Sequence, residues 1–479
     1  MEMVLFEHQK PHFANVKRIL SEWYAYLDTS QTGTGKTIIA IETAKEFNLP
    51  MIVVGEVSTK GMWEQTCRKH GAGLLQFLSY AKLRGKNDYL IKGEEFQVSP
   101  YGEKVLRDGV LLVYDECHNL KNRSLQSEAA CCLSSWIVAN SIHSRIACLS
   151  ATPVDKEGQI LSLMRIMGIV LNSKLYEYNQ STEEYILTGL EELANMARLL
   201  SPIDAQEIMP EHITKANASH VAYQLFKEVI KPRLSSAISN VLILPDKDIA
   251  NGYYRIEEPA DREKLEAGVN SLRKLVRMRG DEAELISTGG NWSRLTEAMM
   301  TIEKAKVGTM VRLARQTLAI PHTKVILYFN YLDPIAEAEY ALRDYDPLVM
   351  TGSSKDRDRI ISAFNRPDDT SRLLIANTRV AGTGINLDDT HGGYPRHIFM
   401  IPTYNFIDLH QATGRIHRAT TKSPATVRLV YGTVDGADKC LEHVILAALA
   451  RKSMVTRGAV NDETVVYPGE YPIYREPLD

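Results

Sequence analysis

Short apolar runs alternate with polar turns and longer amphipathic stretches through the first 155 residues. A short apolar run that ends at once in a polar or glycine-rich cluster is typical of a strand buried on both faces of a parallel sheet. Such sheets bind their ligands beyond the carboxyl ends of the strands. The pattern therefore predicts an α/β unit over residues 1–155, with strands near residues 23–27, 51–54, 110–114 and 146–149.

Helical periodicity dominates between residues 156 and 320, most clearly over residues 182–200 and 260–278. A turn-rich segment at residues 244–254 interrupts this periodicity with the breakers Pro245, Asp246, Asn251 and Gly252. We therefore predict a helical insertion and linker over residues 156–320.

The alternation of apolar runs and amphipathic stretches returns after residue 321 and predicts a second α/β unit over residues 321–450. Its expected strands are residues 325–329, 348–350, 373–376, 397–401 and 427–431. Residues 451–479 are polar and contain three prolines, which predicts a C-terminal tail that forms an arm or is partly disordered. The predicted fold class is α/β, with two parallel-sheet units and a helical insertion between them.

The composition, 44% hydrophobic and 24% charged, is that of an ordinary folded protein. No apolar run approaches the roughly 20 residues that span a bilayer. The N-terminus carries Glu2 and lacks the basic start of a secretory signal. The six cysteines form no C-x-x-C pair, so reduced thiols are expected rather than zinc or disulfides. These features predict a soluble intracellular protein.

The net charge is -3, with a pI near 6.5, and this argues mildly against a nucleic-acid partner. The objection is weak, because acidic outer faces can cancel the charge of a basic groove.

The strongest motif is S-Q-T-G-T-G-K-T at residues 30–37, which follows a predicted strand and opens a predicted helix. In that context glycines let backbone N–H groups close on phosphates, and the helix N-terminus favours negative charge. Lys36 is expected to reach the β- and γ-phosphates, and the Thr37 hydroxyl to bind Mg²⁺. The motif predicts an ATP site formed by Gly33, Thr34, Gly35, Lys36 and Thr37. Ser30 stands where the commonest pattern has glycine.

The second motif is D-E-C-H at residues 115–118, directly after the apolar run 110–114. Asp115 is expected to hold Mg²⁺, directly or through water, and Glu116 to orient and deprotonate the attacking water. A solvated acidic turn would explain the motif equally well if it stood alone, but the phosphate loop favours the catalytic interpretation.

The third motif is S-A-T at residues 150–152, again just past a predicted strand. Hydroxyl groups there can couple the acidic motif to a nucleic-acid surface, so Ser150 and Thr152 are candidate coupling residues. The tripeptide is common in turns, and its value lies in its order after the other two motifs.

In this order the motifs resemble those of superfamily 2 helicases, most closely their Swi/Snf-like branch of double-stranded DNA translocases. The acidic motif continues as N-L-K-N-R-S to Ser124 and is similar to the DEAH-x-L-K-N extension of that branch. Two positions depart from the pattern. Cys117 replaces the commoner alanine, and S-A-T stands where much of the branch has T-G-T, which keeps general DExH helicases open.

The resemblance extends to other parts of the first unit. The segment F-E-H-Q resembles the motif in which a glutamine, here Gln9, reads the adenine edge. Ser58, Thr59 and Lys60, followed by Trp63, resemble a motif that touches the nucleic-acid backbone. Tyr80 belongs to a further nucleic-acid motif, L-S-Y.

The second unit matches in the same way. Residues 324–329 resemble motif IV, and the family's G-S segment implies nucleic-acid contacts by Thr351, Gly352 and Ser353. Residues 377–387 resemble motif V, which implies contacts by Thr378 and Arg379. Residues 411–418 match motif VI, Q-x-x-G-R-x-x-R, so Gln411 would bind nucleotide and Arg415 and Arg418 would be arginine fingers.

The interpretation of Arg415 and Arg418 as arginine fingers depends on the presence of the phosphate loop. Basic residues three apart on a helix usually form a solvated face or a surface ion pair. With an ATP site elsewhere in the chain, however, arginines supplied by a second unit meet the charge demand of phosphoryl transfer.

The predicted insertion also contains basic and aromatic residues. In the family this region forms helical protrusions that brace the duplex, but a solvated helix face explains its basic residues at least as well. The basic residues are Lys231, Arg233, Arg273, Lys274, Arg277 and Arg279. Trp292, Tyr253 and Tyr254 are expected to serve packing, and none of these residues is assigned to a site.

The resemblance implies a motor that uses ATP and Mg²⁺ to move on duplex or branched DNA without sequence specificity. Some viruses encode compact relatives, which would place such a protein in a host cell. The alternative is an RNA helicase or transcription-release NTPase of the DExH type. A catalytically inactive scaffold conflicts with the intact Lys36, Glu116, Arg415 and Arg418, and a restriction-system motor lacks a nuclease signature.

Overall fold

The chain divides into two compact units in the computed structural model. The first comprises Met1–Val241 with Val455–Val465, and the second comprises Leu242–Met454 with Val466–Asp479. The structure describes residues 5–179, 181, 184–238, 245–279, 282–285, 292–381, 385–418, 420–433, 440–460 and 464–477. Both units are α/β, as the alternation of apolar runs predicted, and each is described separately below.

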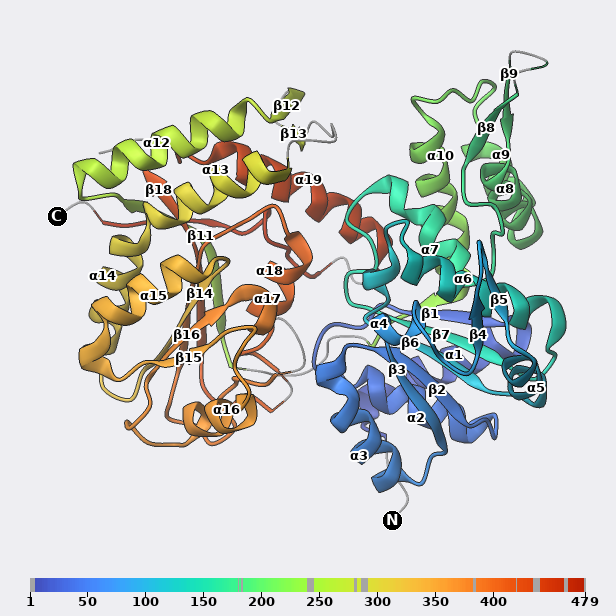
Figure 1. Ribbon diagram of the computed structural model, residues 1–479, viewed down its shortest axis with the longest axis horizontal. Coiled ribbons are helices and arrows are strands. Elements are labelled where there is room, and N and C mark those ends of the chain that lie inside the picture. The colour runs from blue at the N-terminus through green and yellow to red at the C-terminus, as the bar shows by residue number, and fades with distance from the viewer. Residues whose placement is uncertain are drawn as a thin grey trace. The chain divides into compact units, whose positions relative to one another are not determined.

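The first unit is built on a parallel sheet with strand order β10-β1-β7-β6-β2-β3 (Figure 1). The four predicted strands are confirmed, and β3 and β10 extend the sheet at its two edges. The strands are β1 Ala25–Asp28, β2 Met51–Gly55, β3 Leu74–Ser79, β6 Leu111–Asp115, β7 Arg145–Leu149 and β10 Ser235–Ser236. β3 was missed because Gln76 interrupts its apolar residues, and β10 because two serines give no apolar run.

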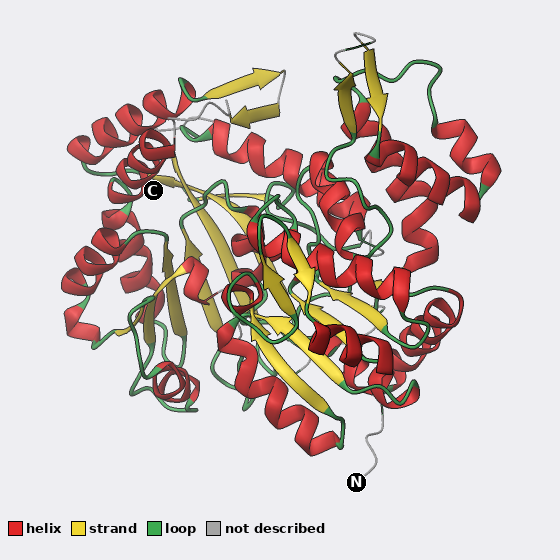
Figure 2. Ribbon diagram, turned by 45° about the vertical axis from the view of Figure 1, so that its right-hand side comes forward, coloured by secondary structure: helices red, strands yellow, loops and turns green. Residues whose placement is uncertain are grey.

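Helices flank this sheet (Figure 2), because the apolar faces of helices and strands are removed from water together. The longer ones are α1 Lys10–Glu22, α2 Lys36–Glu46, α3 Lys60–His70, α5 Pro100–Asp108, α6 Leu125–Asn140 and α7 Ile160–Ile166. Short helices are η1 Glu7–Gln9, η2 Val57–Thr59, α4 Tyr80–Leu83, η3 Cys117–Leu120 and η4 Glu157–Gln159.

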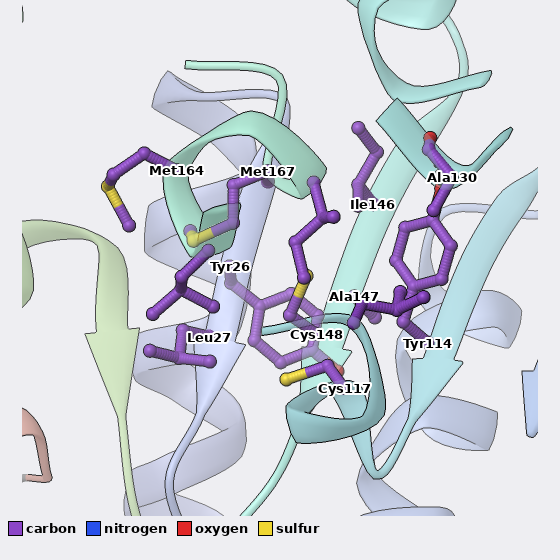
Figure 3. Packing of buried hydrophobic residues seen from close by; sticks show 14 of the residues in the cluster. Tyr26, Leu27, Tyr114, Cys117, Ala130, Ile146, Ala147, Cys148, Met164 and Met167 are labelled. Atoms are coloured by element: carbon purple, nitrogen blue, oxygen red, sulfur yellow. Dashed lines mark hydrogen bonds between the residues drawn. The ribbon is translucent and has the colours of Figure 1, made fainter. Parts of the chain in front are cut away.

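Sulfur-bearing side chains fill part of the core beside β7. Cys117 of η3 lies next to Cys148 of β7, and Met164 and Met167 lie close by (Figure 3). Cys117 is buried, and its hydrogen bond with Cys148 together with burial raises the pKa of its thiol well above the ordinary value. The departure from alanine at this position is therefore accommodated as core packing.

The remainder of the first unit consists of short helices and two antiparallel hairpins. The hairpins pair β4 Leu90–Lys92 with β5 Phe96–Val98 and β8 Tyr176–Asn179 with β9 Glu184–Leu187. The helices are α8 Gly189–Leu200, α9 Pro202–Ile208, α10 Ala218–Gln224, the π-helix η5 Leu225–Ile230 and α11 Lys231–Leu234. The helix predicted over residues 182–200 is thus correct only from Gly189 onward. The segment before it carries tyrosines that pair across β8 and β9, where Tyr178 and Tyr185 have ring centroids 5.2 Å apart.

The second unit is built on a parallel sheet with order β15-β16-β14-β17-β18-β11-β19. Its strands are β11 Lys247–Arg255, β14 Lys324–Phe329, β15 Leu348–Met350, β16 Leu373–Asn377, β17 Arg396–Met400, β18 Ala425–Thr433 and β19 Ile473–Arg475. All five predicted strands of this unit are confirmed. The register is continuous, since β14 pairs with β16 on one side and β17 on the other.

The turn-rich assignment of residues 244–254 is wrong over most of its length. Residues from Lys247 onward form β11, which pairs in parallel with both β18 and β19. Asn251 is tolerated because its side-chain Nδ2 donates to the Tyr471 carbonyl. Gly252 lies where an added Cβ would be 2.4 Å from the Tyr254 ring. Residues that break isolated strands are therefore held here by contacts from distant segments.

Helices of the second unit are α12 Pro259–Arg273, α13 Trp292–Lys304, α14 Val307–Leu318, α15 Leu332–Ala341, η6 Arg343–Tyr345, α16 Arg357–Asn365, α17 Thr378–Ala381 and α18 Phe406–Thr413. The last helix, α19 His443–Ala459, belongs to the second unit up to Met454 and to the first unit from Val455 onward. A hairpin of β12 Val276–Arg279 and β13 Glu282–Leu285 follows α12.

The side chains of Arg277, Arg279 and Trp292 lie outside the described residues. Tyr253 and Tyr254 are buried, as expected for packing residues. Among the described residues, no helix combines the length and apolar character needed to cross a membrane.

The structure divides the segment 156–320 differently from the prediction. Residues up to Val241 belong to the first unit, whereas Leu242 and the residues after it belong to the second. The expected tail is also structured in part, because α19 runs to Ala459 and β19 adds a strand to the second sheet. Periodicity gave the type of these elements but not the sheet on which each one packs.

A buried carboxylate fixes the end of β14 in the second unit. Glu303, near the end of α13, accepts hydrogen bonds from the backbone N–H groups of Asn330 and Tyr331 at 2.8 and 3.0 Å. Its second oxygen accepts from Asn330 Nδ2 at 2.7 Å. Burial raises the pKa of Glu303 to about 7, against the opposing effect of these bonds and of the Lys306 charge. The carboxyl group therefore changes its charge near neutral pH.

Glu303→Gln should reduce the dependence of stability on pH. With a folded pKa of about 7 and an ordinary value of 4.5, the folded chain binds more protons than the unfolded chain between these values, so wild-type stability falls as pH rises through this window. The substitution should narrow the difference in unfolding free energy between pH 5 and pH 8 by about 1–3 kcal/mol. Urea unfolding at both pH values measures it, with the exposed Glu337→Gln as control. An unchanged difference would contradict the prediction.

Candidate functional site

The phosphate loop connects the end of β1 at Asp28 to the start of α2 at Lys36. Gly33 and Gly35 have positive φ angles of 82° and 105°, a conformation that side chains with a Cβ rarely adopt. An added Cβ on Gly35 would also lie 2.4 Å from Gln9 Nε2. Both glycines of the motif are therefore required by the backbone.

Two side chains close on this loop. Lys36 Nζ donates to the carbonyl oxygens of Ser30 and Gln31 at 2.8 and 3.1 Å, so the ammonium lies over the loop. Gln9 is buried, donates to the Thr34 carbonyl at 3.0 Å and accepts from the Phe6 N–H at 3.1 Å. Thr34 is buried as well, and its hydroxyl bonds within the loop to the Gln31 carbonyl. Gln9 thus lies against the loop, where its remaining donor and acceptor suit an adenine edge.

The acidic motif begins at the carboxyl end of β6. Asp115 is buried, and its Oδ2 accepts from the Trp63 indole N–H at 2.8 Å and from the Thr59 hydroxyl at 3.4 Å. Burial and the neighbouring Glu116 charge raise the pKa of Asp115 to about 6, while the Trp63 bond and the Lys36 charge oppose the rise. The phosphate loop and the acidic motif leave the same edge of the sheet, because Leu149 at the end of β7 pairs with both Asp28 and Asp115.

Glu116 has a φ of 54°, which is unusual for a residue with a side chain and marks a constrained turn. His118 Nδ1 lies 3.2 Å from Glu116 Oε2 and 3.1 Å from the Ser150 hydroxyl. Ser150 Oγ also accepts from the Thr152 N–H at 3.1 Å. The acidic motif and the S-A-T motif are therefore joined through His118.

The structure corrects the nucleic-acid assignment of two residues in the first unit. Thr59 and Tyr80 are buried, and both bond to the acidic motif. The Tyr80 hydroxyl donates to the Asp115 carbonyl at 2.6 Å. Burial withdraws both side chains from the surface, and their hydrogen bonds assign them a role in supporting the acidic motif. Ser58 and Lys60 of the same segment are exposed.

The arginines of the second unit converge on one carbonyl oxygen. Arg415 Nη1 and Arg418 Nη2 each donate to the Ile385 carbonyl at 3.3 Å. The Leu387 N–H donates back to the Arg415 carbonyl at 3.0 Å. Motifs V and VI are thereby bonded together, and Gln411 is buried on the adjoining helix α18.

The predicted nucleic-acid residues of the second unit fall into two groups. Gly352, Ser353 and Arg379 are exposed, and Thr351 is partly exposed after β15 with its hydroxyl 2.9 Å from that of Ser353. Thr378 is buried and donates to the Phe329 carbonyl at 3.2 Å, so its predicted contact is corrected to a role in packing. The glycines of motif V, residues 382–384, lie outside the described residues.

Comparisons with known proteins identify a matching family model and several similar proteins. Residues 306–420 match the family described as the helicase conserved C-terminal domain. The putative ATP-dependent RNA helicase L364 of Acanthamoeba polyphaga mimivirus is 24% identical over 477 residues, which cover 95% of this chain and 84% of that protein. These similarities support a helicase-type ATPase of superfamily 2.

Two further relatives are more distant or shorter in overlap. A DNA repair and recombination protein, RAD54-like, of Danio rerio is 22% identical over 421 residues, 81% of this chain and 54% of that protein. A probable global transactivator of Orgyia pseudotsugata multicapsid polyhedrosis virus is 23% identical over 376 residues, 74% of this chain and 68% of that protein. The chain thus spans about half the length of the RAD54-like relative.

The donor set of this site fits a magnesium nucleotide. Backbone N–H groups at the start of α2, the Lys36 ammonium and the Thr37 hydroxyl are suited to phosphate oxygens and to Mg²⁺. One carboxylate, Asp115, stands at the neighbouring strand end, and Mg²⁺ is usually held by one or two carboxylates together with substrate phosphates. An ion bound there would neutralise charge on the phosphates, and Glu116 would orient and deprotonate the attacking water.

Sequence reasoning missed two features of this site. Trp63 was noted only as a family marker, and its bond to Asp115 gave no signal in the sequence because 52 residues separate the partners. His12 and Asp28 were also missed, although their buried pair lies at the start of the phosphate loop. An aspartate as the last residue of a strand before the loop was the signal that could have been found.

Trp63→Phe should impair turnover while preserving the aromatic packing. It removes the indole N–H that holds Asp115, and a hydrogen bond to a charged group contributes about 1.5–3 kcal/mol. We expect kcat to fall by about tenfold or more and the Mg²⁺ concentration for half-maximal activity to rise. Steady-state ATPase assays over a Mg²⁺ series test this, with Trp136→Phe on α6 as control. A wild-type Mg²⁺ requirement in Trp63→Phe would show that Asp115 needs no such support.

Proposed function

We propose that this chain is a motor that couples ATP hydrolysis to movement along duplex or branched DNA. The observation that carries the proposal is the bonding of Asp115 to Trp63 and Thr59. These two residues flank Lys60, which is exposed on the segment assigned to the nucleic-acid backbone. If this segment shifts when nucleic acid binds, the shift would move the Asp115 carboxylate, which is assigned to Mg²⁺. Nucleic acid could therefore stimulate the ATPase directly through these two bonds.

The hydrolysis step follows from the roles assigned to individual side chains. Lys36 and Thr37 would hold the phosphates and Mg²⁺, and Asp115 would hold the ion from the neighbouring strand. Glu116 takes a proton from the attacking water, with His118 orienting its carboxylate. By the match to motif VI, Arg415 and Arg418 are assigned to the charge that spreads over the γ-phosphate oxygens in the transition state. Gln9 and Gln411 are assigned to the nucleotide.

We assign the nucleic-acid contacts to the exposed members of the predicted set: Ser58, Lys60, Thr351, Gly352, Ser353 and Arg379. Hydroxyls, a glycine backbone and cations are suited to phosphate oxygens, which carry no sequence information. Binding should therefore be independent of sequence and should weaken steeply with salt. ATP would bind one conformation of the chain more tightly than another and would shift the population toward it. Hydrolysis would release this preference, so the contacts with nucleic acid would change during each cycle. Ser150 and Thr152 are assigned to coupling, and the bond from Ser150 to His118 supports that assignment.

DNA is favoured as the substrate by the L-K-N extension of the acidic motif, by Trp63 and by the G-I-N-L ending of motif V, which are similar to the Swi/Snf-like branch. The RAD54-like relative, described as a DNA repair and recombination protein, supports this choice. Remodelling of forks or junctions, strand annealing and branch migration are the activities we propose. An RNA helicase of the DExH type is the second candidate, because the mimivirus relative, matched over 95% of this chain, is described as a putative RNA helicase.

ATPase stimulation by different nucleic acids should distinguish the two candidates. We expect duplex and branched DNA to stimulate turnover more than single-stranded DNA or RNA, because the L-K-N extension, Trp63 and the G-I-N-L ending resemble those of double-stranded DNA translocases. Steady-state ATPase is measured with each substrate at equal nucleotide concentration and at two salt concentrations. Stimulation by RNA alone would establish the second candidate, and a complete lack of turnover with every substrate would leave only a scaffold.

Substitutions in the ATP site should separate binding from hydrolysis. Lys36→Ala should abolish turnover together with tight ATP binding, because the ammonium that holds the phosphates is lost. Glu116→Gln should abolish turnover but retain ATP binding, and Arg415→Ala should lose hydrolysis but retain nucleic-acid binding. ATPase rates, fluorescent-nucleotide titration and DNA-binding assays measure these outcomes, with the exposed Arg343→Ala as control. Normal turnover of Glu116→Gln would remove it from the role of general base.

A further inference from the structure

A buried polar network lies directly beneath the phosphate loop. His12 of α1 bonds through Nε2 to Asp28 Oδ2 at 3.0 Å, and its Nδ1 lies 2.8 Å from the Ser236 hydroxyl. Asp28 Oδ1 accepts from the Ser30 N–H at 2.9 Å. We call these four residues, His12, Asp28, Ser30 and Ser236, the anchor network. It joins α1, the end of β1, the first part of the phosphate loop and the edge strand β10.

Asp28 is a buried charge whose partners keep it ionised. Burial by itself would raise the pKa of Asp28, but the His12 ring and the Lys36 charge outweigh this effect and hold the pKa below its ordinary value. The His12 Nε2 proton is donated to the carboxylate, and Asn15 Nδ2 donates to Ser236 Oγ at 3.0 Å. Hydrogen bonds require defined distances and angles, so a displacement of one partner by about 1 Å would break any of these contacts.

The network also holds the chain where it leaves the first unit. Ser30 Oγ accepts from the Ile238 N–H at 2.8 Å, and the Thr29 N–H donates to the Ser236 carbonyl at 2.9 Å. Ile238 precedes the division between the units at Val241 by only three residues. The chain that leads to the second unit therefore departs from residues bonded to the phosphate loop. A glycine in place of Ser30 could not supply the acceptor for Ile238.

The chain of contacts from Ser236 through His12 to Asp28 resembles the catalytic triad of a hydrolase, but burial excludes a catalytic role for Ser236. Ser236 is 4% exposed, His12 3% and Asp28 0%, so no substrate can reach the hydroxyl. Ser236 Oγ is also engaged by Asn15. Its surroundings are a sheet edge and a loop connection rather than a binding cleft.

We propose that the anchor network fixes one connection between the units, the segment that follows Ile238, to the phosphate loop, so that nucleotide at the loop controls this connection. The proposal rests on the proposed function, since it assigns to that ATP site a route for its conformational output. Phosphates would draw the loop and Lys36 toward themselves and would thereby displace Ser30. Because Ser30 Oγ is bonded to the Ile238 N–H, this displacement would reach the segment that follows Ile238. His12, Asp28 and Ser236 are positioning residues, because they act through the loop and do not touch the nucleotide.

Ser236→Ala tests the proposal without altering a residue assigned to ATP or nucleic acid. It removes the hydroxyl partner of His12 and Asn15. We expect turnover without nucleic acid to stay within about twofold of wild type, while stimulation by nucleic acid falls at least about fivefold. Ser236→Thr, which retains the hydroxyl, should restore stimulation.

Ser235→Ala is the matched control, because it removes the neighbouring buried hydroxyl, which donates to the Lys231 carbonyl instead. An equal loss of stimulation in both alanine variants, or full stimulation in Ser236→Ala at a lowered melting temperature, would reduce the network to a structural role and overturn the proposal.

Hydrogen exchange at the Ile238 amide provides the second readout. In the wild type, a non-hydrolysable magnesium ATP analogue should change the exchange rate of this amide by at least about fivefold, and Ser236→Ala should lose most of that change while still binding the analogue. No response in the wild type at a saturating analogue concentration would overturn the proposal. Absence of ATPase activity with every nucleic acid would overturn the proposed function alone, because the exchange response requires only nucleotide binding.

Discussion

The register of three parallel strands determines the chemistry of the first unit. Leu149, the last residue of β7, is paired with Asp28 at the end of β1 and with Asp115 at the end of β6. The phosphate loop, the S-A-T motif and the acidic motif therefore begin at the same level of the sheet, on adjacent strands. A shift of one residue in this pairing would turn the side chains of a strand to the opposite face. Three motifs more than thirty residues apart act at one place because the hydrogen bonds of the sheet fix this register.

Bringing carboxylates to one sheet edge has an electrostatic cost that the surrounding residues offset. Asp115 is buried beside Glu116, and both effects raise the pKa of Asp115. Trp63, Thr59 and Lys36 favour its charged form, as His12 and Lys36 do for Asp28. A buried charge persists only when it is paired or hydrogen-bonded. The same contacts that offset burial also connect the site to α1, α3 and β10, so stabilisation and coupling arise from one set of bonds.

The second unit uses a carbonyl oxygen and a buried carboxylate to order its motifs. Arg415 and Arg418 share the Ile385 carbonyl, which fixes motif VI against motif V. Glu303 holds the loop after β14 through Asn330, and Asn377 of motif V donates to the Asn330 carbonyl at 2.9 Å. These bonds lie at the carboxyl ends of the strands, as in the first unit. Loops that would otherwise be mobile are thereby given defined positions on a rigid sheet.

The sequence by itself determined the α/β class, the nine central strands and the three motifs of the ATP site, because these features are written in local patterns. Apolar runs identify strands buried on both faces, and glycines with a lysine identify a phosphate loop wherever they stand between strand and helix. The tertiary structure alone decided that β11 belongs to the second sheet, since its Asn251 and Gly252 read locally as a turn. It also decided that Thr59, Tyr80 and Thr378 are buried supports, and that Trp63 and His12 hold the two key carboxylates. Such roles depend on contacts between residues far apart in the chain, and a hydrogen bond across 52 residues leaves no periodic trace in the sequence.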